Sequence, residues 1–192
     1  MSEKKVLVPL LDGFEEIEAV TIIDVLRRAE VAVVIGGDRV GAVRGAHGIE
    51  IGADAALEDI EASTLRMIVL PGGMPGSANL AQHPTVQALL TKLAQAGGYT
   101  CAICAAPMAL AAAGVHVGKT VTCYPGFQSQ LEGGEFVEDR VVVDGKVATS
   151  RGPGTALEFA LTLVGMLAGA DAEARLEEQM LVARSESARR VG

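Results

Sequence analysis

Short apolar runs constrain the fold of this chain more than any other feature. Residues 5–11, 31–36, 67–70 and 99–103 each form such a run. Runs of this length suit parallel strands that are buried on both faces. Segments with helical character alternate with them, at 15–29, 84–96, 105–113 and 155–168. This alternation predicts an α/β fold, with a doubly wound, mostly parallel sheet sandwiched by helices.

The stretch from residue 135 to residue 149 is expected to leave this pattern. Residues 135–137, 140–143 and 146–149 resemble short strands, and Asp144-Gly145 is a hairpin dipeptide, so we expect a small antiparallel hairpin excursion. Two more short strands are expected at 39–43 and 49–53. A closing helix is expected at 172–182. The chain, residues 1–192, shows no linker and no internal repeat, which predicts one domain. The last ~10 residues are expected to be flexible.

Charge and cysteine usage exclude several classes of partner. The net charge is −8 and no basic cluster stands out, which argues against nucleic acid and anionic membranes. No apolar run is long enough to span a bilayer, and the first residues resemble a strand rather than a signal peptide. The three cysteines, Cys101, Cys104 and Cys123, do not make a disulfide framework. These features predict a soluble protein in the reducing cytoplasm.

Cys104 lies where the strand-like run 99–103 meets an alanine-rich helical segment. A side chain on such a tight turn is held up at the carboxyl end of a sheet, which is the geometry of a nucleophile elbow. The free N–H groups at the start of the helix would favour the thiolate. The alternative is that Cys104 is a small buried hydrophobe, as most free cysteines are. The residues of this stretch alone leave both interpretations open.

Glu18 is the unusual residue of the first helical segment. At helical spacing it aligns with Ile22, Val25 and Ala29, which are all apolar. A carboxyl group in such a line is expected to be partly buried, and burial raises its pKa and favours the protonated form. The alternative is a solvated position at the rim, the usual location of a helix glutamate.

Three strand ends are expected to meet at one edge of the sheet, close to Glu18. They are Asp12-Gly13, the glycine-rich loop 71–76 and Cys104. The loop could present backbone N–H groups to an oxyanion, whereas no phosphate-binding glycine motif is present. Cys101 and Cys104 would point to opposite faces of an extended chain, which disfavours a redox pair and a zinc site. We therefore expect no metal and no other cofactor.

Five segments together resemble the DJ-1/PfpI (ThiJ/PfpI) superfamily. They are G-F-E-E-I-E at 13–18, V-L-P-G-G at 69–73, A-I-C-A-A-P at 102–107, T-C-Y-P at 122–125 and T-S-R-G-P-G-T at 149–155. Their order and spacing are similar to those of the bacterial DJ-1-like branch. The resemblance covers nearly the whole chain, and it implies a flavodoxin-like fold and a homodimer.

The resemblance also implies roles for particular residues. Cys104 would be the nucleophile, and Glu18 would be its protonated partner and would lower the thiol pKa. The loop at Gly72 and Gly73 and the N–H group of Ala105 would bind an oxyanion or the substrate.

The resemblance also bears on Tyr124, Arg28 and His47. Tyr124 stands where the family often has histidine, and it would either donate a hydrogen bond to substrate or wall the pocket. Arg28 and His47 match positions near the site or the dimer interface. His83 and His116 belong to no motif, and surface or loop roles are expected for both.

The implied activity is that of a glutathione-independent glyoxalase or deglycase. A low-pKa thiolate beside a protonated carboxyl suits reversible addition to small dicarbonyls such as methylglyoxal and glyoxal. Ala105 follows Cys104 where the peptidase-like branch has histidine, so peptidase activity is not expected. The alternative function is an oxidative-stress redox sensor or a chaperone that uses the same cysteine without turnover.

Overall fold

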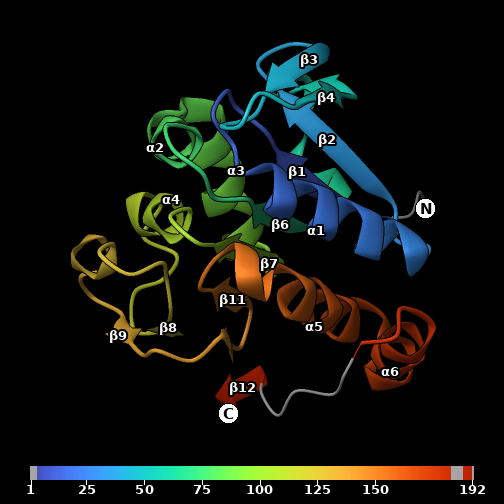
Figure 1. Cartoon of the computed structure of the whole chain (residues 1–192). Helices are drawn as coiled ribbons and strands as arrows, with labels where there is room; N and C mark the ends of the chain where they lie inside the picture. The colour runs from blue at the N-terminus through green and yellow to red at the C-terminus, as the bar shows by residue number, and fades with distance from the viewer. Residues whose placement is uncertain (1–3, 183–187, 192) are drawn as a thin grey trace.

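An eight-stranded sheet runs through the molecule in the computed structural model, which describes residues 4–182 and 188–191 (Figure 1). Neighbouring strands are parallel, except that β10 and β11 form an antiparallel pair. This arrangement confirms the predicted doubly wound, mostly parallel sheet. Across the sheet the strands are β12 (Ala188–Val191), β10 (Val141–Asp144), β11 (Val147–Ser150), β7 (Tyr99–Ile103), β6 (Leu65–Leu70), β1 (Lys5–Pro9), β2 (Val33–Gly37) and β5 (Ala55–Ala56).

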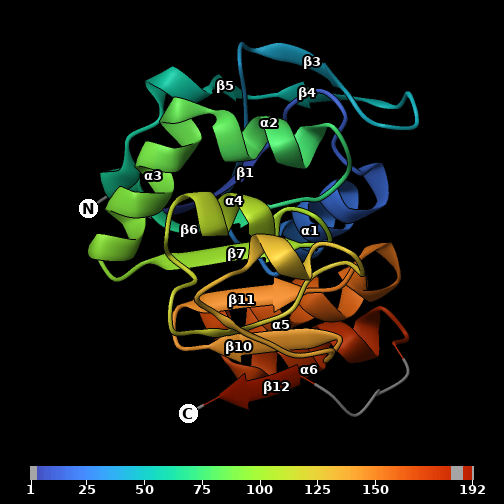
Figure 2. The same cartoon turned by 90° about the vertical axis from the view of Figure 1, so that its left-hand side faces the viewer.

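Helices cover both faces of this sheet, as Figures 1 and 2 show. One face carries α1 (Glu16–Arg28) and α5 (Ala156–Ala168), and α6 (Ala170–Gln179) packs against α5. The other face carries α2 (Gly76–Gln82), α3 (Pro84–Gln95) and α4 (Pro107–Ala112). The sheet is therefore the middle layer of three, as the alternation of strands and helices predicts.

The central strands are apolar on both sides because each side faces a layer of helices. In β6, Met67 and Val69 belong to the core on the α1 and α5 side, whereas Ile68 and Leu70 belong to the opposite core. Successive side chains of a strand point to opposite faces, so a continuous apolar run fills two cores at once. The run 67–70 thus has the environment that its sequence predicts.

The predicted antiparallel hairpin forms at Asp144-Gly145, but both of its strands join the main sheet instead of leaving it. The segments that do leave the main sheet are β8 (Thr120–Val121) and β9 (Glu135–Phe136), which pair in parallel. The predicted short strands around 45–48 form the hairpin of β3 (Gly41–Arg44) and β4 (Glu50–Ala53). Short 3-10 helices span Leu57–Asp59, Ala62–Thr64, Gln128–Gln130 and Pro153–Thr155.

The C-terminal segment is described only in part. Residues 183–187 and 192 of the expected flexible end lie outside the described residues, whereas Ala188–Val191 form β12 beside β10. Within the described ranges, every helix is too short or too polar to traverse a bilayer.

Candidate active site

Loops from three strands meet at the carboxyl edge of the sheet, where the first turn of α1 also begins. The amide of Glu15 donates to the carbonyl of Gly72 at 2.9 Å, and the amide of Gly76 donates to Gly13 at 3.2 Å. A Cβ atom on Gly13 would lie 2.7 Å from the backbone nitrogen of Pro75, so the two loops are too close for a side chain at this position. The structure thus brings the loop after β1 and the 71–76 loop together, as predicted.

Cys104 occupies the sharp turn between β7 and α4. Its φ angle is +64°, a left-handed conformation that a non-glycine residue adopts only at a cost in energy. Its amide donates to the carbonyl of Ser150 at 2.9 Å, and its carbonyl accepts from the amide of Tyr124 at 2.8 Å. The strained turn is therefore held from both sides, and the predicted elbow geometry is present. The helix begins at Pro107, so Ala105 belongs to the turn rather than to the predicted helix.

The sulfur of Cys104 lies among backbone donors. The N–H groups of Gly73 and Ala105 both hydrogen-bond to the thiol sulfur. Gly73 has a φ angle of +88°, and a Cβ atom there would lie 2.3 Å from the amide nitrogen of Glu15, so only glycine fits this position. The two N–H groups named from the family resemblance thus converge on one atom.

Glu18 is fully buried at the start of α1, and its carboxyl group faces the thiol. Oε2 accepts a hydrogen bond from the amide of Gly72 at 2.7 Å, whereas Oε1 has no partner. Burial raises the pKa of Glu18 from 4.5 to about 7, although the contacts with Gly72 and Cys104 act in the opposite direction. The sequence prediction of a buried carboxyl with a raised pKa is confirmed, and the solvated alternative is wrong.

Gly72 allows Glu18 and Cys104 to approach each other. A Cβ atom on Gly72 would lie 2.7 Å from Oε2 of Glu18, 2.5 Å from Cβ of Cys104 and 3.1 Å from its sulfur. No side chain fits between the carboxyl group and the thiol without moving one of them. Glycine at this position is a geometric requirement of the pair.

The thiol pKa of Cys104 is raised in the structure, whereas the sequence analysis expects it to be low. Burial raises the pKa of Cys104 to about 12, and the negative charge of Glu18 raises it as well. The N–H groups of Gly73 and Ala105 lower it, but they do not overcome the loss of water around a side chain that is only 9% exposed. The expected low thiol pKa is therefore wrong, because the donors can be inferred from the sequence and the depth of burial cannot.

The ring of Tyr124 and the sulfur of Cys104 both lie beside Gly152. The ring carbon Cδ2 of Tyr124 would lie 3.1 Å from a Cβ atom on Gly152, and that same Cβ would lie 4.0 Å from the sulfur of Cys104. The ring is half exposed and packs edge-on against Phe127, with the centroids 6.5 Å apart. Gly152 is a site residue that the sequence analysis did not single out, although it lies inside the segment T-S-R-G-P-G-T that carries part of the family resemblance.

His47 contacts the first turn of α1 rather than the sulfur. Its ring nitrogen Nδ1 lies 2.9 Å from Oε2 of Glu16 and 3.6 Å from Oε2 of Glu15. The buried Glu16 also accepts the amides of His47 and Ile49, and although burial acts in the opposite direction, these hydrogen bonds lower its pKa. The β3–β4 hairpin is thus tied to the helix that carries Glu18.

Among the residues that the structure describes, Glu15, Glu16 and His47 also form a group of possible metal ligands, with ligand atoms within 4.8 Å of one another. The imidazole and the carboxylate of Glu16 already satisfy each other in this group. Their contacts need no cation.

Arg28 lies at the opposite end of α1 from Glu18. Ten residues of helix separate the two, which corresponds to about 15 Å. Its Nε is 2.6 Å from Oδ2 of Asp24, an exposed pair within the same helix. The structure does not bring Arg28 to the thiol, and a place at a dimer interface stays a prediction.

The other cysteines and histidines have structural surroundings. Cys101 and Cys123 are fully buried and free, and each thiol pKa is raised by burial. His83 caps α3 and lies 3.0 Å from Asp38, whereas His116 is buried in a loop and contacts the carbonyl of Glu132 at 3.0 Å. Arg151 lies near Cys123, and its Nη1 is buried without a partner.

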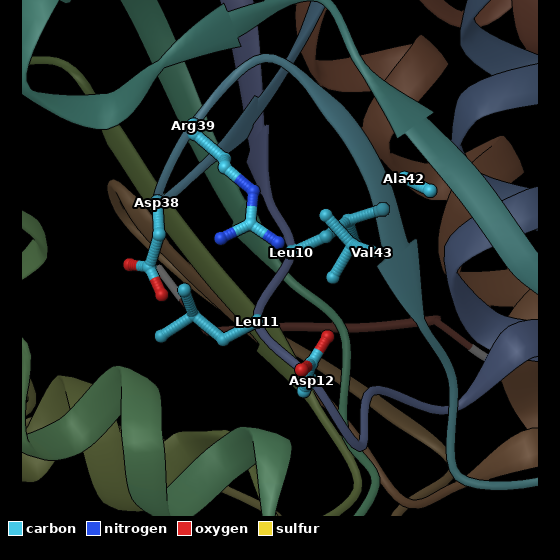
Figure 3. Close-up of a pocket in the computed structure, with 7 residues that line it drawn as sticks. All are labelled: Leu10, Leu11, Asp12, Asp38, Arg39, Ala42 and Val43. Atoms are coloured by element: carbon cyan, nitrogen blue, oxygen red, sulfur yellow. The ribbon is translucent and has the colours of Figure 1, made fainter.

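A small hollow lies at the ends of β1 and β2, beside this site (Figure 3). Its volume is about 60 Å³, and Figure 3 shows the guanidinium of Arg39 extending over Leu10 and Leu11, with the carboxyl groups of Asp12 and Asp38 nearby. This volume holds a few water molecules at most. The small hollow is therefore a poor candidate for a substrate pocket.

Comparison with known proteins gives consistent matches. A sequence model of the DJ-1/PfpI family matches residues 4–166. Protein DJ-1 homolog B of Arabidopsis thaliana is 45% identical over 172 residues, which cover 88% of this chain but only 39% of the plant protein. Glutathione-independent glyoxalase DJR-1.2 of Caenorhabditis elegans is 39% identical over 181 residues, covering 93% of this chain and 96% of that protein. The crystal structure of Drosophila melanogaster DJ-1beta superposes with a TM-score of 0.90 at 41% identity, covering 95% of this chain and 100% of the other.

Proposed function

This chain belongs to the DJ-1/PfpI family, and on that premise we propose that it is a glutathione-independent glyoxalase or deglycase-type enzyme. Its substrates would be small reactive dicarbonyls such as methylglyoxal and glyoxal. The observation that carries the proposal is the pair of Cys104 and Glu18, in which a buried carboxyl with a pKa of about 7 lies against the thiol. The C. elegans relative that is named a glyoxalase supports the same reaction class.

The raised thiol pKa determines how the first step would proceed. The thiol is protonated at neutral pH, so it needs a base as it attacks. With a pKa of about 7, Glu18 is ionised in roughly half of the molecules at pH 7, which suits a general base. Glu18 takes the thiol proton while the sulfur of Cys104 adds to the aldehyde carbon. The N–H groups of Gly73 and Ala105 stabilise the resulting oxyanion.

The later steps need only the same carboxyl group and one water molecule. Glu18 returns the proton to the oxyanion and forms a hemithioacetal on Cys104. As a carboxylate it then removes the proton from the former aldehyde carbon and gives it to the neighbouring ketone oxygen, which forms an enediol. It next takes the proton of the hydroxyl group beside the sulfur and delivers it to the neighbouring carbon. The product is a 2-hydroxyacyl thioester, and water hydrolyses it to lactate and the free thiol. The sum is methylglyoxal plus water giving lactate, with no net oxidation and no glutathione.

The redox-sensor alternative needs a different state of the same sulfur. Peroxide oxidises the thiolate rather than the thiol, and two equivalents would give the sulfinic acid. Because burial raises the thiol pKa, both reactions need Glu18 to take the thiol proton. The relative that is named a glyoxalase is the observation that favours the glyoxalase.

A homodimer in the cytoplasm is part of the proposal. Ile17 and Val20 lie one turn apart on α1 and are 58% and 49% exposed, and Ile49 on the adjoining hairpin is 58% exposed. Exposed apolar side chains that gather on one face support a protein contact. The free cysteines are consistent with a reducing compartment. Light scattering of wild type and Val20→Glu tests the dimer, which the buried charge should dissociate.

The activity is tested by glutathione-free consumption of methylglyoxal with lactate quantified. Cys104→Ser should abolish lactate formation, and Glu18→Gln should lower it by about 100-fold or more, the usual contribution of a general base. Cys101→Ala removes a buried thiol of β7, the strand that leads into Cys104, and should keep wild-type turnover. Absence of lactate from wild type, or its survival in Cys104→Ser, would refute the proposal.

A further inference from the structure

A hollow of about 410 Å³ lies at the amino-terminal edge of the sheet, on the opposite side from Cys104. Three basic residues line it: Lys4 before β1, Arg66 at the start of β6 and Lys92 in the last turn of α3. Ala62, Ala96 and Tyr99 add apolar surface above the buried Leu65 and Leu93. Figure 2 shows α3 turning back at this edge into β7. We call this site the basic hollow.

The charge of the basic hollow is unusual for this chain. Acidic residues outnumber basic ones by 24 to 16, yet among residues 4–182 and 188–191 no aspartate or glutamate lines the site. Within the described part of the chain, Lys4, Arg66 and Lys92 make no ion pair. The carboxyl end of α3 contributes only about half a negative charge against them.

Two further features of the positive charges at this site favour an anion. The Nε atom of Arg66 is buried and has no hydrogen-bond partner, and a guanidinium stays charged at all physiological pH values. A buried donor without an acceptor lowers stability unless water or an ion satisfies it. The ammonium group of Lys146 lies 3.9 Å from the ring centroid of Tyr99, which adds a fourth positive charge beside the basic hollow.

We propose that the basic hollow binds an organic phosphate with a flat apolar ring, the chemistry of a nucleoside monophosphate. Its volume falls within the range of small-molecule pockets. Arginine and lysine together are the usual ligands of a phosphate group. Ala62, Ala96 and Tyr99 provide the surface for the ring. The site is independent of Cys104 and of the reaction proposed there.

Calorimetric titration of the whole protein with AMP at low salt tests this site. Wild type should bind AMP, and Arg66→Gln should weaken binding by about tenfold or more, because a charge-assisted contact with phosphate is lost. Arg39→Gln is the matched control, since it removes one exposed guanidinium at the opposite edge of the sheet and should leave affinity unchanged. Raising the salt concentration should weaken binding by screening the exposed lysines.

Two further titrations separate the phosphate from the ring. Adenosine and inorganic phosphate should each bind at least about tenfold more weakly than AMP, because each supplies half of the contacts. Equal affinity for AMP and phosphate would overturn the ring, and equal affinity for AMP and adenosine would overturn the phosphate.

A measurement on unmodified protein covers the case in which Arg66→Gln fails to fold. In nuclear magnetic resonance spectra, AMP should shift the amide signals of Gly97 and Gly98, which line the basic hollow. No binding of millimolar AMP, or shifts centred at other residues, would refute the site.

Discussion

Glu18→Gln should make the folded protein more stable at alkaline pH while it removes activity. Glutamine has the size of glutamate, and its carbonyl oxygen can still accept the hydrogen bond from Gly72 that Oε2 accepts at 2.7 Å. The substitution therefore removes the charge of a fully buried group and keeps its packing. A residue that serves catalysis at a cost in stability should behave in this way.

The magnitude follows from the pKa of the carboxyl group. Burial raises it from 4.5 to about 7. A carboxyl group with a raised pKa favours folding below pH 4.5, and this contribution is lost as pH rises through about 7. Each tenfold change in proton affinity corresponds to about 1.4 kcal/mol. At pH 8 the buried Glu18 must ionise, and its raised pKa costs roughly 3 kcal/mol of folding free energy. At pH 5 the group must instead take up a proton on folding, which costs about 1 kcal/mol. Glutamine avoids both costs.

Urea denaturation at pH 5 and pH 8, at one protein concentration, measures the difference. The gain in unfolding free energy of Glu18→Gln over wild type should be about 2 kcal/mol larger at pH 8 than at pH 5. Glu58→Gln, which removes an exposed carboxyl group, should show no such dependence. A gain that is absent at pH 8, or equal at the two pH values, would refute the argument that burial sets the pKa of Glu18.

Three further predictions concern turnover. The kcat/KM for methylglyoxal should rise with pH through about 7 as Glu18 ionises and should become flat in Glu18→Gln; a fall above that pH in wild type would show an acid role instead. Gly72→Ala should lower kcat by at least about tenfold while the protein still folds, because its Cβ would lie 2.7 Å from Oε2 of Glu18, and unchanged turnover would contradict the close approach. Tyr124→Phe should keep activity within about twofold if the ring only walls the pocket, whereas a larger loss would identify its hydroxyl as a donor to substrate.

Periodicity predicts most of the fold because the elements have strong local signals. The first helix, predicted at 15–29, spans Glu16–Arg28, and the helix predicted at 84–96 spans Pro84–Gln95. The missed helix α2, Gly76–Gln82, has no side-chain cap and begins with glycine, a poor helix former. Glycine is required at 76 because a Cβ atom would lie 2.7 Å from the amide nitrogen of Phe14. The glycine at the start of α2 is therefore required by a tertiary contact, which no local sequence pattern reveals.

The candidate site could be predicted where one residue type has a local meaning. Glu18 stood out because its helical neighbours are apolar, and Cys104 because it joins a strand to a helix. Gly152 could not be found in this way, since its importance comes from the ring of Tyr124 and the sulfur, which lie far from it in sequence. The thiol pKa could not be predicted either, because sequence shows which N–H groups are near but not how much water the fold removes.

Two physical costs of this fold meet at one sulfur atom. Cys104 holds a left-handed backbone conformation, which costs roughly 1–2 kcal/mol for a residue with a side chain. Beside it Glu18 is fully buried, with Oε1 unpartnered and about 3 kcal/mol lost when it ionises. A core built only for stability would place leucine at 18 and an unstrained turn at 104. The two apolar cores on either side of the sheet are large enough to carry these losses. Strain at the thiol and a carboxyl group with a pKa near neutrality beside it are therefore best explained by a reaction that needs a thiol and a base together.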